Sequence, residues 1–209
     1  MEQTGITQAQ DGLRFGPLGG HCLHLCVDMQ NLFSQGSPWE TPWMERVLPA
    51  VEALAERHAE RTVFTRFIPL RSPREGRGTW RRYYERWPEM RLDALPPEAI
   101  DLLPPLARFV PPAEVLDKTV YSPWSGTELE ERLRARDVDT LVITGVETDV
   151  CVLAAVLGAV DRGYRVVLPT DALCSSSDRT HDALLALYRE RYGQQVETAR
   201  MADILSAWD

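Results

Sequence analysis

A cysteine that directly follows a predicted strand is the residue of this chain best suited to chemistry. Residues 140–144 form a β-branched, apolar run typical of a strand buried on both faces, and Gly145 ends that run. Helix-favouring residues begin at Asp149, with Thr148 as the expected N-cap, which puts Cys151 in the first helical turn. Free N–H groups and the positive end of a helix favour a thiolate there. Cys151 is therefore a candidate nucleophile; the alternative is a small packing residue.

Two further titratable residues, Asp28 and Lys118, stand at the ends of other predicted strands. In an open α/β sheet, the groups that follow the carboxyl ends of the strands meet at one edge. Asp28, Lys118 and Cys151 at that edge would supply a base, a cation and a nucleophile, the groups that acyl transfer requires. Taken singly, each has a plainer explanation, Asp28 as a cap and Lys118 as a solvated turn residue.

The elements that must position these residues alternate between strands and helices. Strands are expected at 21–29, 61–67, 115–118, 140–144, 165–169 and 195–198, and helices at 42–60, 126–136, 149–162, 178–192 and 201–208. Such alternation predicts an α/β fold of three layers, α/β/α, with a mainly parallel, Rossmann-like central sheet of about six strands.

A single domain is expected over residues 21–209, preceded by a loose, polar and Gly-rich leader over residues 1–20. Residues 68–113 differ from the rest because they are rich in proline, arginine and aromatic residues. They predict a loop-rich insertion, and an insertion of this length in a compact domain is more often functional than idle. Within it, the Arg-Arg-Tyr-Tyr run at 81–84 is interpreted as a short solvated stretch or a pocket lid.

Composition limits the classes of partner. The net charge of -8 argues against a general nucleic-acid binder, and no apolar run approaches membrane-spanning length. Four cysteines are too few for a disulfide scaffold, and residues 1–20 lack the pattern of a signal peptide. We therefore expect a cytoplasmic protein whose partner is a small-molecule substrate, with no nucleic acid and no membrane.

Four motifs carry a resemblance to a known family. They are VDMQNLF at 27–33, DKTVYSPW at 117–124, GVETDVCV at 145–152 and TDALCSSSDRTHDA at 170–183. With these motifs in order, most of residues 23–200 resembles the isochorismatase-like cysteine hydrolases, the superfamily of nicotinamidase, carbamoylsarcosine amidohydrolase and ureidoacrylate amidohydrolase.

The resemblance implies roles for particular residues. It implies a catalytic triad of Asp28, Lys118 and Cys151, a cis peptide bond before Glu147, and an oxyanion hole formed by the backbone N–H groups of Glu147 and Cys151. It also implies a hydrolase that cleaves a C–N bond of a small amide, ureide or carbamoyl compound through a thioester. Each oxyanion donor is worth roughly 3–4 kcal/mol in other acyl-transfer enzymes.

Departures from the family pattern refine this expectation. Nicotinamidases bind a metal through an Asp-x-His pattern after the second strand, whereas residues 65–67 here read Thr-Arg-Phe and offer no ligand set. We therefore expect neither a metal nor another cofactor. Isochorismate-cleaving relatives commonly lack the cysteine that this chain keeps, so vinyl-ether hydrolysis is the second hypothesis. A non-catalytic binding protein on the same fold is a third, and a thiol redox protein is disfavoured because the chain has no Cys-x-x-Cys pair.

Five side chains are candidates for substrate contacts. Arg66 ends the second strand, where its guanidinium would grip a substrate carboxylate, although pairing with a structural acid explains it as well. Four aromatic residues close to the catalytic motifs are expected to wall a compact pocket: Phe33, Trp39, Tyr121 and Trp124.

Two other clusters contain the letters of a site. Cys22, His24 and Cys26 share one face of the first strand, but a buried parallel strand leaves little room for a fourth metal ligand. The serines at 175–177, with a following aspartate and histidine, are interpreted as helix caps and not as a serine triad.

The predicted helix after Cys151 is apolar all round through its middle. Such a helix must be covered on its outer side as well as against the sheet. We therefore expect a homodimer or homotetramer.

Overall fold

A computed structural model describes residues 12–209, and at its centre lies a parallel β-sheet. The strand order is β3-β2-β1-β4-β5-β7, with β6 paired to β4, and every pairing is parallel. The predicted parallel sheet of about six strands is confirmed, with one short strand added. The strands are β1 (Cys22–Val27), β2 (Thr62–Phe67), β3 (Glu114–Lys118), β4 (Thr140–Val146), β5 (Arg165–Pro169), β6 (Leu173–Cys174) and β7 (Val196–Ala199).

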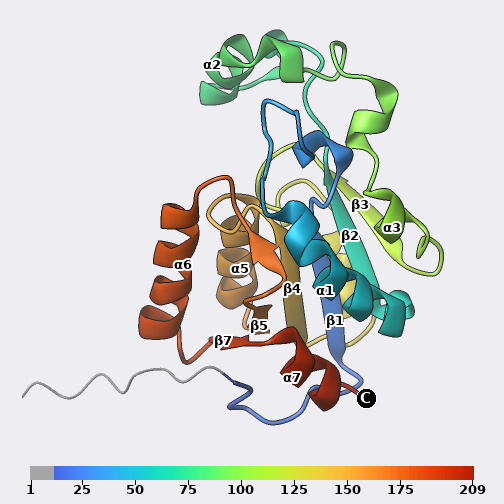
Figure 1. Cartoon of the computed structure of the whole chain (residues 1–209), viewed down its shortest axis with the longest axis vertical. Helices are drawn as coiled ribbons and strands as arrows, with labels where there is room; N and C mark the ends of the chain where they lie inside the picture. The colour runs from blue at the N-terminus through green and yellow to red at the C-terminus, as the bar shows by residue number, and fades with distance from the viewer. Residues whose placement is uncertain (1–11) are drawn as a thin grey trace, which may run out of the picture.

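Helices cover both faces of this sheet, which confirms the three layers (Figure 1). Side chains of α1 (Met44–Arg57), α3 (Pro104–Ala107) and α7 (Met201–Ala207) pack against one face. Those of α4 (Leu129–Arg134), α5 (Cys151–Asp161) and α6 (Asp178–Arg191) pack against the other. Helix α1 follows the helical periodicity of the sequence. Its apolar residues recur on one side and are buried there: Val47, Val51, Leu54 and Ala55.

The short strand β6 takes the place of β5 beside the carboxyl end of β4. Strand β4 pairs with β5 over residues 140–142, and with β6 at residues 145–146. The carboxyl end of β4 is therefore held on both sides, by β1 and by β6, just before the chain turns into α5. A two-residue strand leaves no periodicity to detect, and the sequence does not predict it.

Strand β1 is completely buried, and the polar side chain at its middle is paired within the sheet. His24 Nδ1 lies 3.2 Å from Thr62 Oγ1, and Nε2 lies 2.8 Å from Thr144 Oγ1. Burial, with His58 nearby, lowers the pKa of His24 to about 3. Both ring nitrogens are thus used by hydroxyl groups, which argues for a structural histidine and not for a metal ligand beside Cys22 and Cys26.

Part of the predicted leader is packed and not loose. Residues 1–11 lie outside the described residues, but residues 12–20 run along the end of the sheet. Leu18 is 3% exposed, pairs with Trp208 and donates its N–H to Ala207 O at 2.8 Å. The Arg14 guanidinium donates to Val196 O at 2.9 Å. Backbone pairing, which composition does not reveal, fixes this segment.

The predicted insertion at 68–113 begins beyond the carboxyl end of the sheet, where it holds the small helix α2 (Thr79–Arg86), and returns through α3 beside the sheet to the start of β3 (Figure 1). Short 3-10 helices occur within the insertion and elsewhere. They lie at Asn31–Phe33, Ala59–Arg61, Pro73–Glu75, Pro88–Met90 and Pro97–Ile100. Over residues 12–209, no helix is both long enough and apolar enough to cross a membrane.

Candidate active site

Asp28 follows β1 directly and is anchored to the neighbouring strand β2. Its backbone has a φ of 52°, in the left-handed region that residues other than glycine seldom adopt. Its N–H donates to Thr65 O at 3.2 Å, and the Thr65 hydroxyl donates to Asp28 Oδ1 at 2.5 Å. The Thr65 hydroxyl thereby holds Oδ1 of the carboxylate, and Oδ2 is left for a second partner.

Lys118, the last residue of β3, binds that other oxygen. Its Nζ lies 2.6 Å from Asp28 Oδ2, and both side chains are fully shielded from solvent. Strand β2 lies between β3 and β1, so the lysine has to reach past it, and its Nζ lies 5.1 Å from the centre of the Phe67 ring. Nζ also donates to Val120 O at 3.2 Å. A long cationic side chain is what this span requires.

Cys151 is the first residue of α5, and its Sγ lies 3.5 Å from Lys118 Nζ. The structure thus brings Asp28, Lys118 and Cys151 together, as the sequence predicts, and we call them the catalytic cluster after the role proposed for them below. The expected N-cap is wrong, because Val150 takes that place and Thr148 does not. The Thr148 hydroxyl instead donates to Cys174 O at 3.1 Å, since the chain makes one more turn before the helix begins.

The electrostatics of the catalytic cluster favour a thiol and not the predicted thiolate. Burial, followed by the charge of Asp28, raises the pKa of Cys151 well above its usual range, and Lys118 only partly opposes this. For Lys118, burial acts to lower the pKa, but the charges of Asp28 and Cys151 outweigh it and the net pKa is raised. These shifts favour a neutral thiol beside the ion pair of Asp28 and Lys118.

The backbone N–H groups of Glu147 and Cys151 are the predicted oxyanion donors. The peptide bond between Val146 and Glu147 is cis, as the resemblance implies. Within residues 12–209, the N–H groups of Glu147 and Cys151 donate to no other backbone group. Gly145, with a φ of 107°, precedes this turn, and a Cβ at that position would collide with Val27 O. Only glycine lets β4 approach β1 so closely there.

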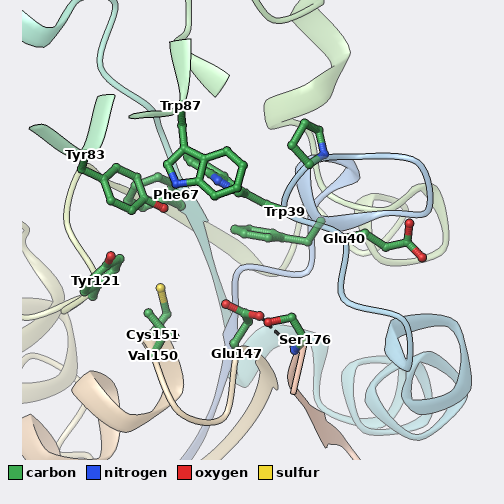
Figure 2. A pocket seen from close by; sticks show the side chains of 12 residues that line it. Trp39, Glu40, Phe67, Tyr83, Trp87, Tyr121, Glu147, Val150, Cys151 and Ser176 are labelled. Atoms are coloured by element: carbon green, nitrogen blue, oxygen red, sulfur yellow. Dashed lines mark hydrogen bonds between the residues drawn. The ribbon is translucent and has the colours of Figure 1, made fainter. Parts of the chain in front are cut away.

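The catalytic cluster opens into a cavity of about 400 Å³ (Figure 2). Cys151 lies at its floor and is 6% exposed. The cavity is lined largely by six rings, which we call the aromatic wall: Phe33, Trp39, Phe67, Tyr83, Trp87 and Tyr121. The other lining residues are Pro38, Glu40, Glu147, Val150 and Ser176.

Three of the predicted pocket residues belong to the aromatic wall, and three of its members are new. Phe33, Trp39 and Tyr121 line the cavity as expected. The sequence predicts no pocket role for Phe67, which lies at the end of β2. Tyr83 and Trp87 come from the insertion, where the lid interpretation of residues 81–84 was the one signal that pointed to the site.

Arg66 does not line the cavity, and the structure gives its predicted contact with substrate no support. Its Nε and one terminal nitrogen donate to the two carboxylate oxygens of Asp117, at 2.7 and 2.9 Å, and Asp101 lies 3.5 Å away. Arg66 and Asp117 are register partners on β2 and β3, so their side chains share a face. The alternative interpretation, a pairing with structural acids, is the one that holds.

Trp124 also lies outside the cavity and is a structural residue. Its Nε1 donates to Ala155 O at 2.9 Å, and its ring stacks on Tyr164 with centroids 5.6 Å apart. Gly158 on α5 provides room for the Trp124 ring, because a Cβ at position 158 would collide with the indole. Trp124 thus covers part of the outer side of α5, while Leu153 and Leu157 on that helix stay partly exposed. The predicted homo-oligomer stays a prediction.

The residues at the place of the nicotinamidase metal pattern have other roles. The Thr65 hydroxyl binds Asp28, Arg66 binds Asp117, and Phe67 lines the cavity. Over the described residues 12–209, no group of three or more His, Cys, Asp or Glu side chains is placed to hold a metal ion. These residues do not fit the metal site of that relative.

Comparison with known proteins gives consistent similarities. The chain is 37% identical over 81 residues to the uncharacterized isochorismatase family protein PncA of Bacillus subtilis, which covers 39% of this chain and 44% of that protein. It is 27% identical over 154 residues to N-carbamoylsarcosine amidase of Arthrobacter sp, which covers 70% of this chain and 57% of that protein. The chain thus spans about half the length of these curated relatives.

A solved structure matches almost the whole fold. The crystal structure of a cysteine hydrolase from Pseudomonas syringae pv. phaseolicola 1448A superposes with a TM-score of 0.80, at 21% identity, over 95% of this chain and 97% of that one. At that identity the match concerns the fold. The Isochorismatase domain model, in contrast, matches the sequence itself over residues 22–200, and the chain therefore belongs to the isochorismatase family.

Proposed function

We propose that this protein is a cysteine amidohydrolase that cleaves the C–N bond of a small amide, ureide or carbamoyl compound. The observation that carries the proposal is the catalytic cluster, in which Lys118 Nζ lies 2.6 Å from Asp28 and 3.5 Å from Cys151 Sγ at the floor of the cavity. A nucleophile, a base and a cation within contact distance are the groups that acyl transfer uses.

The first half-reaction forms a thioester. Asp28 removes the thiol proton as Cys151 Sγ attacks the substrate carbonyl carbon, and the negative charge moves to the carbonyl oxygen. The N–H groups of Glu147 and Cys151 hold that oxyanion, an interaction worth roughly 3–4 kcal/mol per donor. Asp28 then returns the proton to the nitrogen, the C–N bond breaks, and ammonia or an amine leaves. A thiol that is neutral at rest gives Asp28 a proton to take.

The second half-reaction restores the thiol. Asp28 takes a proton from water, the hydroxide attacks the thioester carbon, and the same two N–H groups hold the second oxyanion. The C–S bond breaks and the thiolate regains its proton from Asp28. The net change is one amide and one water giving one acid and one amine. Lys118 stays protonated throughout, and its charge supports both the Asp28 carboxylate and the transient thiolate.

Two further lines of support come from outside the cluster. A relative similar to this chain is named N-carbamoylsarcosine amidase, and a protein that shares its fold is named a cysteine hydrolase. The residues at 65–67 have non-ligand roles, so the steps above use no metal. Prolonged treatment with a strong chelator is expected to leave the activity unchanged.

The test is an ammonia-release screen over small primary amides, ureides and carbamoyl amino acids. Wild type is expected to release ammonia from at least one, and Cys151→Ala is expected to lose turnover by at least about 10⁴-fold. The matched control is Cys22→Ala, since Cys22 is 1% exposed in β1 and lies away from the cavity. That variant is expected to keep its activity. Full activity in Cys151→Ala would contradict the proposal.

A further inference from the structure

The charges around the cavity are unbalanced. Two carboxylates, Glu40 and Glu147, are among its lining residues, while no arginine, lysine or histidine is among the described residues that line it. The nearest cation, Lys118, is already bound to Asp28 at 2.6 Å. Arg66 is held by Asp117 outside the cavity. The space above Cys151 therefore has no cationic side chain with which to receive a negatively charged substrate.

The two carboxylates differ in direction. The Glu147 carboxylate stands beside Cys151 and points up into the cavity (Figure 2). It accepts one hydrogen bond, from Ser176 N–H at 2.9 Å, and a neutral donor does not cancel its charge. The Glu40 carboxylate points away from Cys151 and accepts from Gly36 N–H at 2.8 Å. Glu147 thus supplies a negative charge inside the cavity, on the same side as Cys151.

The aromatic wall adds to this attraction. Trp39 is at its centre, with ring centroids 5.6 Å from Tyr83 and 6.4 Å from Trp87. Trp39 and Trp87 stand across the cavity from Cys151 and Glu147 (Figure 2). The faces of tryptophan and tyrosine rings attract cations, and ammonium groups are bound by several such rings together. A carboxylate meets the same faces with repulsion.

We propose that the site selects amides that carry a positive charge, such as an alkylammonium group held between the aromatic wall and Glu147. This inference rests on the proposed function, because it places the amide carbonyl of the same molecule at Cys151. An anionic substrate would lose its hydration in this cavity without gaining a partner of opposite charge, and is therefore disfavoured.

Three amides of similar size test the proposal. Trimethylammonioacetamide and 3,3-dimethylbutanamide have the same shape and differ in one positive charge, while malonamate carries a negative charge. The value of kcat/KM for ammonia release is expected to be about tenfold or more higher for the cation than for its neutral isostere. Malonamate is expected to be the poorest of the three. Equal values for cation and isostere, or a preference for malonamate, would overturn the inference and leave the proposed function standing.

A binding measurement separates the inference from the chemistry. The Cys151→Ala variant keeps the aromatic wall, and binding near Trp39 and Trp87 is followed by tryptophan fluorescence. Tighter binding of trimethylammonioacetamide than of 3,3-dimethylbutanamide supports the inference even if the wild type hydrolyses neither. The proposed function is then decided separately, by the ammonia-release screen. Absence of binding by the cation, or binding no tighter than that of the isostere, overturns the inference.

Two glutamate variants locate the selectivity. Glu147→Gln keeps an acceptor for Ser176 N–H and removes the charge, so the cation-to-isostere ratio of kcat/KM is expected to fall about fivefold. A loss common to both substrates cancels in this ratio. Glu52→Gln is the control, because its carboxylate binds Arg108 at 2.8 Å and does not line the cavity, and it is expected to leave the ratio unchanged. A ratio that survives Glu147→Gln, or one that falls equally in both variants, would overturn the assignment.

Discussion

The catalytic cluster and the aromatic wall are neighbours in one cavity but are held in different ways. In the cluster, strand ends fix each charged group, and Asp28 is bound on one oxygen by Thr65 and on the other by Lys118. In the wall, the rings contact one another through their faces and edges, and the buried Trp39 Nε1 has no hydrogen-bond partner among the described residues. Most of these rings come from loops and from the insertion at 68–113.

This difference separates the two tasks of the site. The cluster depends on the buried charges of Asp28 and Lys118, so replacing either charged group by a neutral one is expected to lower both activity and stability. The wall depends on ring surface, which tolerates exchange and determines which molecules fit. Under the proposed function, the sheet thus fixes the reacting groups, and the segments at its carboxyl edge determine which substrates fit.

Among the changes that test this difference, the largest expected effect is that of Asp28→Asn in the cluster. It removes the base and leaves the buried Lys118 without a negative partner, so turnover is expected to fall at least about 10³-fold. The free energy of unfolding is expected to fall by about 3–5 kcal/mol in urea titrations. Asp117→Asn is the control, because its partner Arg66 is half-buried and the expected loss is below about 1 kcal/mol. Substantial turnover in Asp28→Asn would refute the assigned base.

Acid is expected to weaken the sheet beneath the cluster through His24. Its pKa is lowered from 6.5 to about 3 in the folded protein, so between these values the unfolded chain binds more protons. Stability is therefore expected to fall as the pH falls, by up to about 1.4 kcal/mol per pH unit. Urea titrations between pH 4 and pH 7 in wild type and in His24→Gln check this. An identical pH slope in the two proteins would rule out His24 as the cause.

A smaller effect is expected at the aromatic wall from Trp39→Leu. The loss of ring surface in the cavity is expected to raise KM about tenfold, with kcat changed by less than about threefold. Trp124→Leu is a matched control, because it removes a tryptophan that packs on α5 outside the cavity. It is expected to lower stability and leave KM unchanged. A Trp39→Leu variant that lost kcat with KM intact would place Trp39 in the chemistry and end the division of tasks.

The smallest effect is expected at Arg66, which is not among the residues that line the cavity. Because Arg66 is paired with Asp117 and does not line the cavity, Arg66→Ala is expected to change KM by less than about twofold. Steady-state kinetics with the substrate found in the screen measure this. A large rise in KM would bring Arg66 back to the substrate.

The same division explains how far the sequence could be interpreted. Asp28, Lys118 and Cys151 follow strands whose apolar runs are visible, so topology alone brings them to one edge. Tyr83 and Trp87 belong to the insertion at 68–113, where the sequence has no periodic pattern that predicts the direction of a side chain. The partner of Arg66 depends on the register of β2 against β3, which no local pattern encodes.

Other features depend on tertiary context in the same way. Trp124 follows a catalytic motif but turns to the outside, because Gly158 on α5 leaves room for its ring. The helix dipole predicts a thiolate at Cys151, whereas burial and the charge of Asp28 favour the neutral thiol in the structure. Short-range rules thus predict where a side chain starts, and packing determines what it meets.

Trapping the acyl intermediate is the most direct test of the central claim that Cys151 is the nucleophile of the catalytic cluster. Wild type mixed with an amide that it hydrolyses is quenched in acid and analysed by intact mass and peptide mapping. We expect one acyl group on the peptide that contains Cys151, and no adduct in Cys151→Ala. An acyl group on another residue, or ammonia release by Cys151→Ala at the rate of wild type, would contradict the account.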